Sequence, residues 1–226
     1  SGAWADPQAG IALGHRRLSI IDLSPAGHQP MASSSGRFVI AFNGEIYNHL
    51  ELRAELDNSS NPSALPRVAG ATLKWRGHSD TETLLAGFEH WGVAATLAKT
   101  VGMFAIVLWD VQQRTLHLTR DRFGEKPLYY GWTGSGTRNA FVFGSELKSL
   151  RAFPEFVNSI CRRALSQYMR FMYVPAPRSI YQNIYKLEPG CLLSIKGTAP
   201  MAAPTQPLRP PAVYESLTLS RWWSLA

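Results

Sequence analysis

The sequence predicts a mixed α/β globular fold, and three features carry this prediction. Of the 226 residues, 45% are hydrophobic and 11% are aromatic, so the chain can bury a substantial core and offset its ordering entropy. Short apolar runs between residues 103 and 144 (MFAIVLWD, TLHLT, PLYYGW and AFVFG) are separated by turn residues, which is typical of buried strands. Two segments with capping-box patterns predict helices in the same chain.

The first half of the chain is predicted to combine strands with helices. Residues 11–21 and 37–43 have the apolar character of strands, and the second run ends in Asn43-Gly44, a strong turn signal. The pattern Asn48-His49-Leu50-Glu51 predicts the start of one helix. Ser79-Asp80-Thr81-Glu82 predicts the start of another, whose apolar stripe ends before Gly92.

The second half is predicted to be less regular after the β-rich segment. Residues 145–150 and 160–170 indicate helices, and residues 190–195 indicate a short strand. Residues 197–211 are rich in Pro and Ala and are expected to be extended. Trp222 and Trp223 stand close to the end of the chain, where we expect them to need a packing partner outside it.

Charge and composition exclude several classes of protein. The net charge of +7 comes from scattered basic residues without interleaved aromatic residues, so we predict no nucleic-acid partner. No apolar run approaches the roughly 20 residues of a membrane span, and no secretory leader is visible. The six His residues include no helical ligand pair, so we predict no metal site. The only cysteines, Cys161 and Cys191, fit a reducing compartment, which predicts a cytoplasmic protein.

Three polar positions could carry chemistry, although each has an ordinary structural interpretation. Arg17 could bind a substrate carboxylate, or it could be a surface residue of a half-exposed strand. Asn43 and Gly44 could donate hydrogen bonds to an oxyanion, or they could form a common turn. Asp80 could be a binding group, or it could interact only with the helix dipole. Each residue taken alone favours the structural interpretation.

Taken together, six motifs change this balance. The segments GHRRLSIIDLSPAGHQPM, FNGEIYNHLELRAEL, GHSDTETLLAGFEHWG, GMFAIVLWD, LTRDRFGEKPLYYG and FGSELKSL follow one another in this order. Their order and spacing closely resemble the glutamine amidotransferase domain of glutamine-hydrolysing asparagine synthetases, which belongs to the class II, N-terminal-nucleophile type. The resemblance covers residues 1–150 and continues more weakly through YVPAPRSIYQNIYKLEPGCLLSI and RWWSL.

The resemblance implies a fold and a set of site residues. It implies the four-layer αββα sandwich of the N-terminal-nucleophile hydrolases. Arg17, with the backbone through Ile20 and Ile21, would bind the α-carboxylate of glutamine. The Asn43 side chain and the Gly44 N–H would form the oxyanion hole, and Glu45 and Asp80 would receive the α-ammonium group. Asp121 and Arg122 belong to a signature that is expected to orient neighbouring loops.

One departure from the family pattern concerns the nucleophile. In the family the nucleophile is an N-terminal cysteine, whereas residues 1–14 match sequence that lies downstream of it. Cys161 and Cys191 are in the wrong segment, and Ser1 is at the wrong spacing from Arg17. A Ser-Gly-Gly-x-Asp-Ser loop for ATP is also missing. We therefore expect a chain cut at both ends, with an incomplete first strand. Residues 1–151 would form the amidotransferase domain, and residues 152–226 would lead into a synthetase domain.

The functional prediction follows from the resemblance. The parent would hydrolyse L-glutamine to glutamate and ammonia and would use the ammonia for ATP- and Mg²⁺-dependent amidation of aspartate. The chain itself would bind no cofactor and would be inactive alone. Amidation of another carboxylate and a non-catalytic glutamine-binding remnant remain as alternatives. A homodimer is left open.

Overall fold

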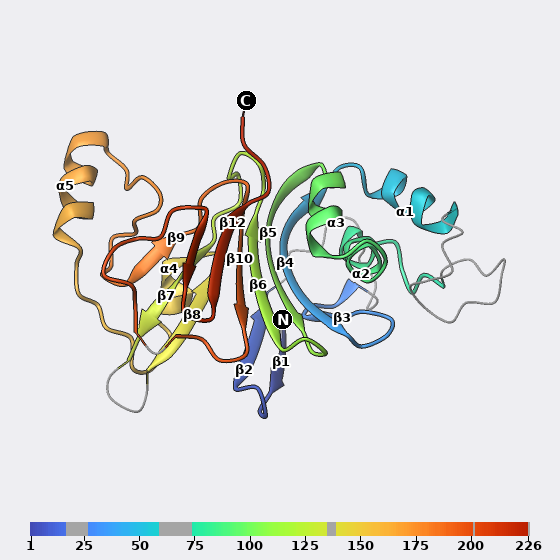
Figure 1. The fold of residues 1–226 in the computed structure, drawn as a ribbon, viewed down its shortest axis with the longest axis horizontal. Helices are drawn as coiled ribbons and strands as arrows, with labels where there is room; N and C mark the ends of the chain where they lie inside the picture. The colour runs from blue at the N-terminus through green and yellow to red at the C-terminus, as the bar shows by residue number, and fades with distance from the viewer. Residues whose placement is uncertain (17–26, 59–73, 135–138, 201, 226) are drawn as a thin grey trace. The chain divides into compact units, whose positions relative to one another are not determined.

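The computed structural model describes residues 1–16, 27–58, 74–134, 139–200 and 202–225 (Figure 1). Arg17, Ile20 and Ile21 lie outside these described residues. Contacts between Cα atoms divide the chain into two compact units, Ser1–Leu116 and His117–Ala226. The domain boundary at residue 151 stays a prediction. Among the described residues, no helix combines the length and the apolar character needed to cross a membrane.

In its described residues, the first unit contains two hairpin-forming strands, an antiparallel sheet and three helices. In chain order its elements are β1 (Gly2–Asp6), β2 (Ile11–His15), β3 (Met31–Ala32), β4 (Phe38–Ile46), α1 (His49–Asn58), α2 (Asp80–His90), α3 (Val93–Lys99) and β5 (Gly102–Asp110). Strand β1 pairs with β2, and β4 pairs on one side with β3 and on the other with β5. Helix α2 packs against β4 and is itself flanked by α1 and α3 (Figure 1).

The pairing of β4 with β5 is the longest in the first unit. At one end of the pair Phe38 lies opposite Asp110, and at the other end Ile46 lies opposite Gly102. Most of β5 and the first part of β4 are buried, because apolar side chains there lie on both faces of the pair. The facing helix α2 contributes Leu84, Leu85 and Phe88, which are each 1% exposed. This strand–helix packing forms the core beneath the candidate site.

The predicted turn at Asn43-Gly44 is wrong, because β4 continues through both residues to Ile46. Asn43 pairs with Ala105 and Gly44 pairs with Phe104. A Cβ atom at Gly44 would contact the Met103 carbonyl oxygen and would lie 2.7 Å from the Phe104 Cα. The glycine therefore permits two strands to approach closely, which is the second common use of glycine besides turns.

The two capping boxes have different outcomes. At α2 the prediction is confirmed, because the Ser79 hydroxyl accepts a hydrogen bond from the Glu82 N–H at 3.2 Å. Helix α1 begins at His49 as expected, but the Asn48 side chain bonds elsewhere. Its amide accepts from the Val101 N–H at 2.9 Å and donates to the Lys99 carbonyl at 3.0 Å. Asn48 thus joins the start of α1 to the end of α3.

The second unit is built on two antiparallel sheets. Its elements are β6 (Thr115–Arg120), which begins in the first unit, then β7 (Tyr129–Thr133), β8 (Ala140–Gly144), α4 (Leu147–Leu150), α5 (Arg162–Phe171), β9 (Ile184–Lys186), β10 (Cys191–Lys196), β11 (Ala212–Tyr214) and β12 (Leu217–Arg221). One sheet of this unit has the order β11-β12-β10-β6, and the other has the order β8-β7-β9. Edge-on contacts of the Trp132 ring with Phe141, Tyr185 and Tyr214 form an aromatic core.

The expectation that the terminal tryptophans lack a partner within the chain is wrong. Strand β12 pairs with β10, which brings the following residues onto the same unit. The Trp222 indole N–H donates to the Thr119 hydroxyl at 3.1 Å, and the Trp223 ring packs edge-on against Phe123 with centroids 5.2 Å apart. The sequence could not reveal this, because the pairing strand lies more than twenty residues upstream.

A tight loop follows β6 around the buried Asp121, and its hydrogen bonds confirm the predicted structural role of this residue. The Asp121 carboxylate accepts hydrogen bonds from the Phe123, Glu125 and Lys126 N–H groups, each at 3.0 Å. The neighbouring Arg120 donates to the carbonyl oxygens of Gly124, Lys126 and Leu187. Two adjacent charged side chains therefore satisfy the polar backbone of one tight loop.

We expect Asp121→Asn to lower the free energy of unfolding by about 2–4 kcal/mol, since an amide cannot accept all three charge-assisted hydrogen bonds. Urea unfolding measures this loss. Glu125→Gln, at an exposed carboxylate of the same loop, is the matched control and should change stability by less than about 0.5 kcal/mol. Equal losses in the two variants would contradict the structural role of Asp121.

Candidate functional site

The candidate site lies at the end of β4, where the strand becomes accessible to solvent. Asn43, Gly44 and Glu45 are three consecutive half-buried residues, and they stand between the buried Phe42 and Ile46. The rest of the strand is held rigidly by its pairing with β5. This segment therefore offers a fixed backbone, a side-chain amide and a carboxylate at one accessible place, as a preorganised binding site requires.

Asp80 connects this strand end to the start of α2. One carboxylate oxygen accepts a hydrogen bond from the Ile46 N–H at 3.0 Å, and the other accepts from the Thr81 N–H in its own helix at 2.8 Å. The residue is 5% exposed. The side chain that looked like a simple dipole partner is thus also a bridge between two elements that are far apart in the sequence.

Burial dominates the electrostatics of Asp80. Removal from water raises the pKa of its carboxyl above the usual range, although the Ile46 and Thr81 N–H groups and nearby His49 act in the opposite direction. The neighbouring Glu45 carboxylate raises this pKa further. The burial of Asp80 is therefore the main electrostatic cost at this place, and the Glu45 carboxylate is a smaller contribution.

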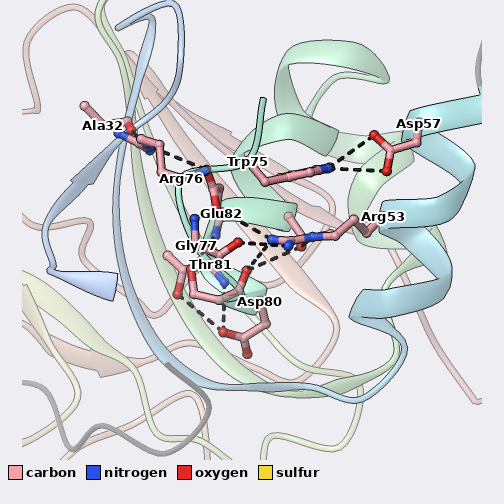
Figure 2. Close-up of polar contacts among 11 residues, drawn as sticks. Ala32, Arg53, Asp57, Trp75, Arg76, Gly77, Asp80, Thr81 and Glu82 are labelled. Carbon is pink, nitrogen blue, oxygen red and sulfur yellow. Dashed lines mark hydrogen bonds and ion pairs between the residues drawn. The ribbon is translucent and has the colours of Figure 1, made fainter. Parts of the chain in front are cut away.

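A cluster around Arg53 and Glu82 holds the segment that leads into Asp80 (Figure 2). The Glu82 carboxylate accepts from the Arg76 N–H at 2.7 Å and from the Gly77 N–H at 3.0 Å. Arg53, on α1, donates to the Gly77 carbonyl at 3.0 Å and to the Ser79 carbonyl at 3.3 Å. Its guanidinium group also lies 3.6 Å from Glu82. The start of α2 is therefore fixed by charge-assisted hydrogen bonds on both sides.

The Trp75 ring completes this cluster. The Arg53 guanidinium lies 4.0 Å from the ring centroid, and the indole N–H donates to the Asp57 carboxylate (Figure 2). Sequence reasoning placed Glu82 in a capping box, but it assigned no role to Arg53 or Trp75. The Glu82 carboxylate accepts from the N–H groups five and six positions upstream, so the capping-box pattern indicates an accepting carboxylate but not which N–H groups donate to it.

Gln29 forms a second bridge between β4 and α2, which sequence reasoning missed. The Gln29 side-chain oxygen accepts a hydrogen bond from the Phe42 N–H at 2.6 Å. The Gln29 amide nitrogen donates one to the Thr81 hydroxyl at 3.4 Å. The residue is 5% exposed. Gln29 thus fixes the backbone just before Asn43. The one available signal was its place in the motif GHQPM, which carries no information about the partner.

The structure brings together four of the predicted site residues. Asn43, Gly44 and Glu45 lie on β4, and Asp80 bonds to the next residue of that strand. Arg17, Ile20 and Ile21 lie outside the described residues, so their roles stay predictions. The described residues contain no group of three or more His, Cys, Asp and Glu side chains arranged to hold a metal ion.

Both cysteines lie in the second unit. Cys191 is fully buried on β10, and burial raises the pKa of its thiol to about 11. Such a thiol is protonated at neutral pH and is a poor nucleophile. Cys161 precedes α5 and is partly exposed.

Solved structures establish the fold class. The chain is similar to the glutamine phosphoribosylpyrophosphate amidotransferase of B. subtilis complexed with ADP and GMP, with a TM-score of 0.55 and 17% identity over 94% of this chain and 35% of that chain. A structure of the allosteric regulatory enzyme of purine biosynthesis gives a TM-score of 0.54 and 17% identity over 92% of this chain and 34% of that chain. The fold is the mixed α/β, αββα sandwich type of the N-terminal-nucleophile amidotransferases.

The family follows from sequence. Residues 1–204 match the glutamine amidotransferase domain family, and the chain belongs to this family. It is 39% identical over 206 residues to a putative glutamine-hydrolysing asparagine synthetase of Mycobacterium tuberculosis, covering 87% of this chain and 29% of that protein. It is also 39% identical over 186 residues to asparagine synthetase [glutamine-hydrolyzing] 1 of Bacillus subtilis, covering 82% of this chain and 26% of that protein.

A third relative has a different name. "Amidase chry2" of Gibberella zeae is 33% identical over 192 residues, covering 84% of this chain and 25% of that protein. The chain thus spans less than a third of the length of these relatives. The predicted resemblance to amidotransferase domains of glutamine-hydrolysing asparagine synthetases is confirmed.

The raised pKa of Asp80 predicts how its contribution to stability depends on pH. The folded state holds the proton more tightly than the unfolded chain, so the contribution is fully present below the unfolded pKa of about 4. It is lost as the pH rises through the raised folded-state pKa. We expect the free energy of unfolding of the native chain, relative to that of Asp80→Asn, to fall as the pH rises above about 4. Urea unfolding across this range measures it, and a difference that increases with pH would contradict the account.

Proposed function

We propose that this chain forms the glutamine-binding part of a glutamine amidotransferase, an enzyme that hydrolyses the side-chain amide of L-glutamine to glutamate and ammonia. The observation that carries this proposal is the family match over residues 1–204, in which the half-buried Asn43–Glu45 segment lies beside the buried Asp80. The family match supports the reaction class, and the donors and carboxylates at the end of β4 support the proposed site.

The amide end of glutamine is assigned to Asn43 and Gly44. Attack on the amide carbonyl places negative charge on its oxygen, and hydrogen-bond donors fixed in advance stabilise that charge without reorganising. The Asn43 side-chain amide and the Gly44 backbone N–H are the donors in this proposal. Strand β4 keeps both groups in place through its pairing with β5. A carbonyl held in this way would be positioned for attack.

The amino-acid end of glutamine is assigned to charged groups. Glu45 and Asp80 would receive the α-ammonium group, and the electrostatics supports this, because these carboxylates repel one another. Arg17, with the backbone through Ile20 and Ile21, would bind the α-carboxylate through its guanidinium fork. Charges at one end and oxyanion donors at the other would fix the length and orientation of the substrate.

The acceptor of the ammonia is assigned by the relatives. Two of them are named glutamine-hydrolysing asparagine synthetases, so we propose that the parent amidates aspartate. ATP and Mg²⁺ would act in a synthetase domain that corresponds to the remaining length of these relatives, and this chain would bind neither. The relative named as an amidase favours a second candidate, in which another carboxylate accepts the ammonia. We propose a cytoplasmic protein without nucleic-acid or membrane partners. A homodimer is one possible oligomeric state.

Glutamine binding tests the site directly. We expect Asp80→Asn to weaken glutamine binding by about tenfold or more, since it removes one charge-assisted contact with the ammonium group. Isothermal titration calorimetry measures the affinity. The matched control is Glu51→Gln, which removes the same charge at an exposed position in the first turn of α1.

The other end of the substrate has its own pair of variants. Arg17→Ala should weaken binding by at least tenfold, whereas Arg16→Ala, at the adjacent arginine, should change it by less than twofold. Unchanged affinity in both Asp80→Asn and Arg17→Ala would refute the proposed site.

Turnover is a separate expectation. We propose that the printed chain binds glutamine but does not hydrolyse it, because the buried Cys191 thiol stays protonated and Cys161 lies in a segment that the family does not use for its nucleophile. A glutaminase assay on the purified chain should give no ammonia above background. Ammonia release that disappears in Ser1→Ala would contradict this and would make Ser1 the nucleophile.

A further inference from the structure

A polar cavity lies in the second unit, and none of its residues belongs to the candidate glutamine site. It has a volume of about 430 Å³, which is within the usual range of small-molecule sites. Its walls come from the start of α5, from residues 178–185 and from residues 205–207. The cavity is therefore built from three segments that are separate in the sequence.

Hydrogen bonds fix two of these walls to one another. The Cys161 N–H donates to the Ile180 carbonyl at 2.9 Å, and the Gln182 N–H donates to the Ser159 carbonyl at 2.8 Å. Ile160 and Tyr181 also form an isolated antiparallel bridge. The third wall is connected through Tyr185, whose hydroxyl donates to the Pro204 carbonyl at 3.3 Å. The cavity is thus held by the backbone of each segment that lines it.

Three arginines line this cavity without any acidic neighbour in it. Arg162 and Arg163 open α5, and Arg178 lies on the opposite segment. Within the described part of the chain, no Asp or Glu lines the cavity, and none of the three guanidinium groups has a hydrogen bond or an ion pair. Arg162 and Arg163 are exposed and Arg178 is half-buried, and together they give the hollow a positive potential.

The start of α5 increases this positive potential. Helix N-termini carry a partial positive charge and normally attract acidic side chains, but the first turn of α5 contains two arginines and no acidic residue. No side chain caps the helix. Two like charges at the positive end of a helix destabilise it, so an anion bound here would relieve a cost that the sequence does not otherwise offset.

We propose that this cavity binds a small phosphate-bearing molecule. Planar guanidinium forks match the oxygens of a phosphoryl group, and three of them balance the charge of a phosphate monoester or a diphosphate. The neutral lining residues Gln182, Asn183, Thr205 and Gln206 offer hydrogen bonds to the remaining part of such a ligand. This site is independent of the proposed glutamine site and can exist without it.

Calorimetric titration of the full chain with inorganic pyrophosphate at constant ionic strength tests the proposal. We expect saturable binding with one site per chain. The double variant R162A/R163A should weaken it at least tenfold. The matched control R151A/R209A removes the same charge from two exposed arginines of the same unit that do not line the cavity, and it should change the affinity by less than twofold. No saturable binding, or equal weakening by both variants, would overturn the proposal.

Alkylation of Cys161 provides a readout in the unsubstituted chain. Cys161 lines the cavity, whereas Cys191 is fully buried and serves as an internal reference. Pyrophosphate should slow the reaction of Cys161 with neutral iodoacetamide at least fivefold, as followed by mass spectrometry of the folded protein, while sodium chloride at matched ionic strength should not. An alkylation rate that pyrophosphate leaves unchanged would place the anion elsewhere and would refute the site.

Discussion

The two hydrogen bonds of the Asp80 carboxylate are the interaction on which the candidate site depends. They join the end of β4 to the first residues of α2, and these two elements carry every described residue that we assign to glutamine. Gln29 strengthens this connection from the other side of Asn43, and the cluster around Arg53 and Glu82 holds the chain that enters α2. Most of the polar contacts at the site therefore position a single carboxylate against a single strand end.

This arrangement has an electrostatic cost that suits a binding function. A carboxylate at a helix N-terminus with two N–H donors would ordinarily ionise easily, yet burial raises the pKa of Asp80, and Glu45 adds to the effect. A purely structural cap would not need a second carboxylate close by. Under the proposed function, an ammonium group bound beside Asp80 would offset part of this burial cost.

The sequence predicted β4, β5 and α2 from apolar periodicity, and the resemblance implied the grouping of Asn43, Gly44, Glu45 and Asp80. It did not predict the strands β1, β11 and β12. It misplaced the Asn43-Gly44 turn, since a glycine that permits close strand approach cannot be distinguished from a turn glycine by sequence alone. The roles of Gln29, Arg53 and Asn48 depend on partners 13 to 53 residues away. Such contacts leave no periodic signal. The doublet Arg162-Arg163 is visible in the sequence, but its nearness to Arg178 in the cavity is not.

The most direct test of the central claim is a backbone amide spectrum of the ¹⁵N-labelled chain during titration with L-glutamine. The account predicts saturable shifts that are largest at Asn43, Gly44 and Thr81, because the ligand would bond to or lie beside these groups. It also predicts that the amide resonances of α5 do not shift during the titration. Saturable shifts that avoid the end of β4 and the start of α2, or no saturable shifts at all, would contradict the assignment of this site to glutamine.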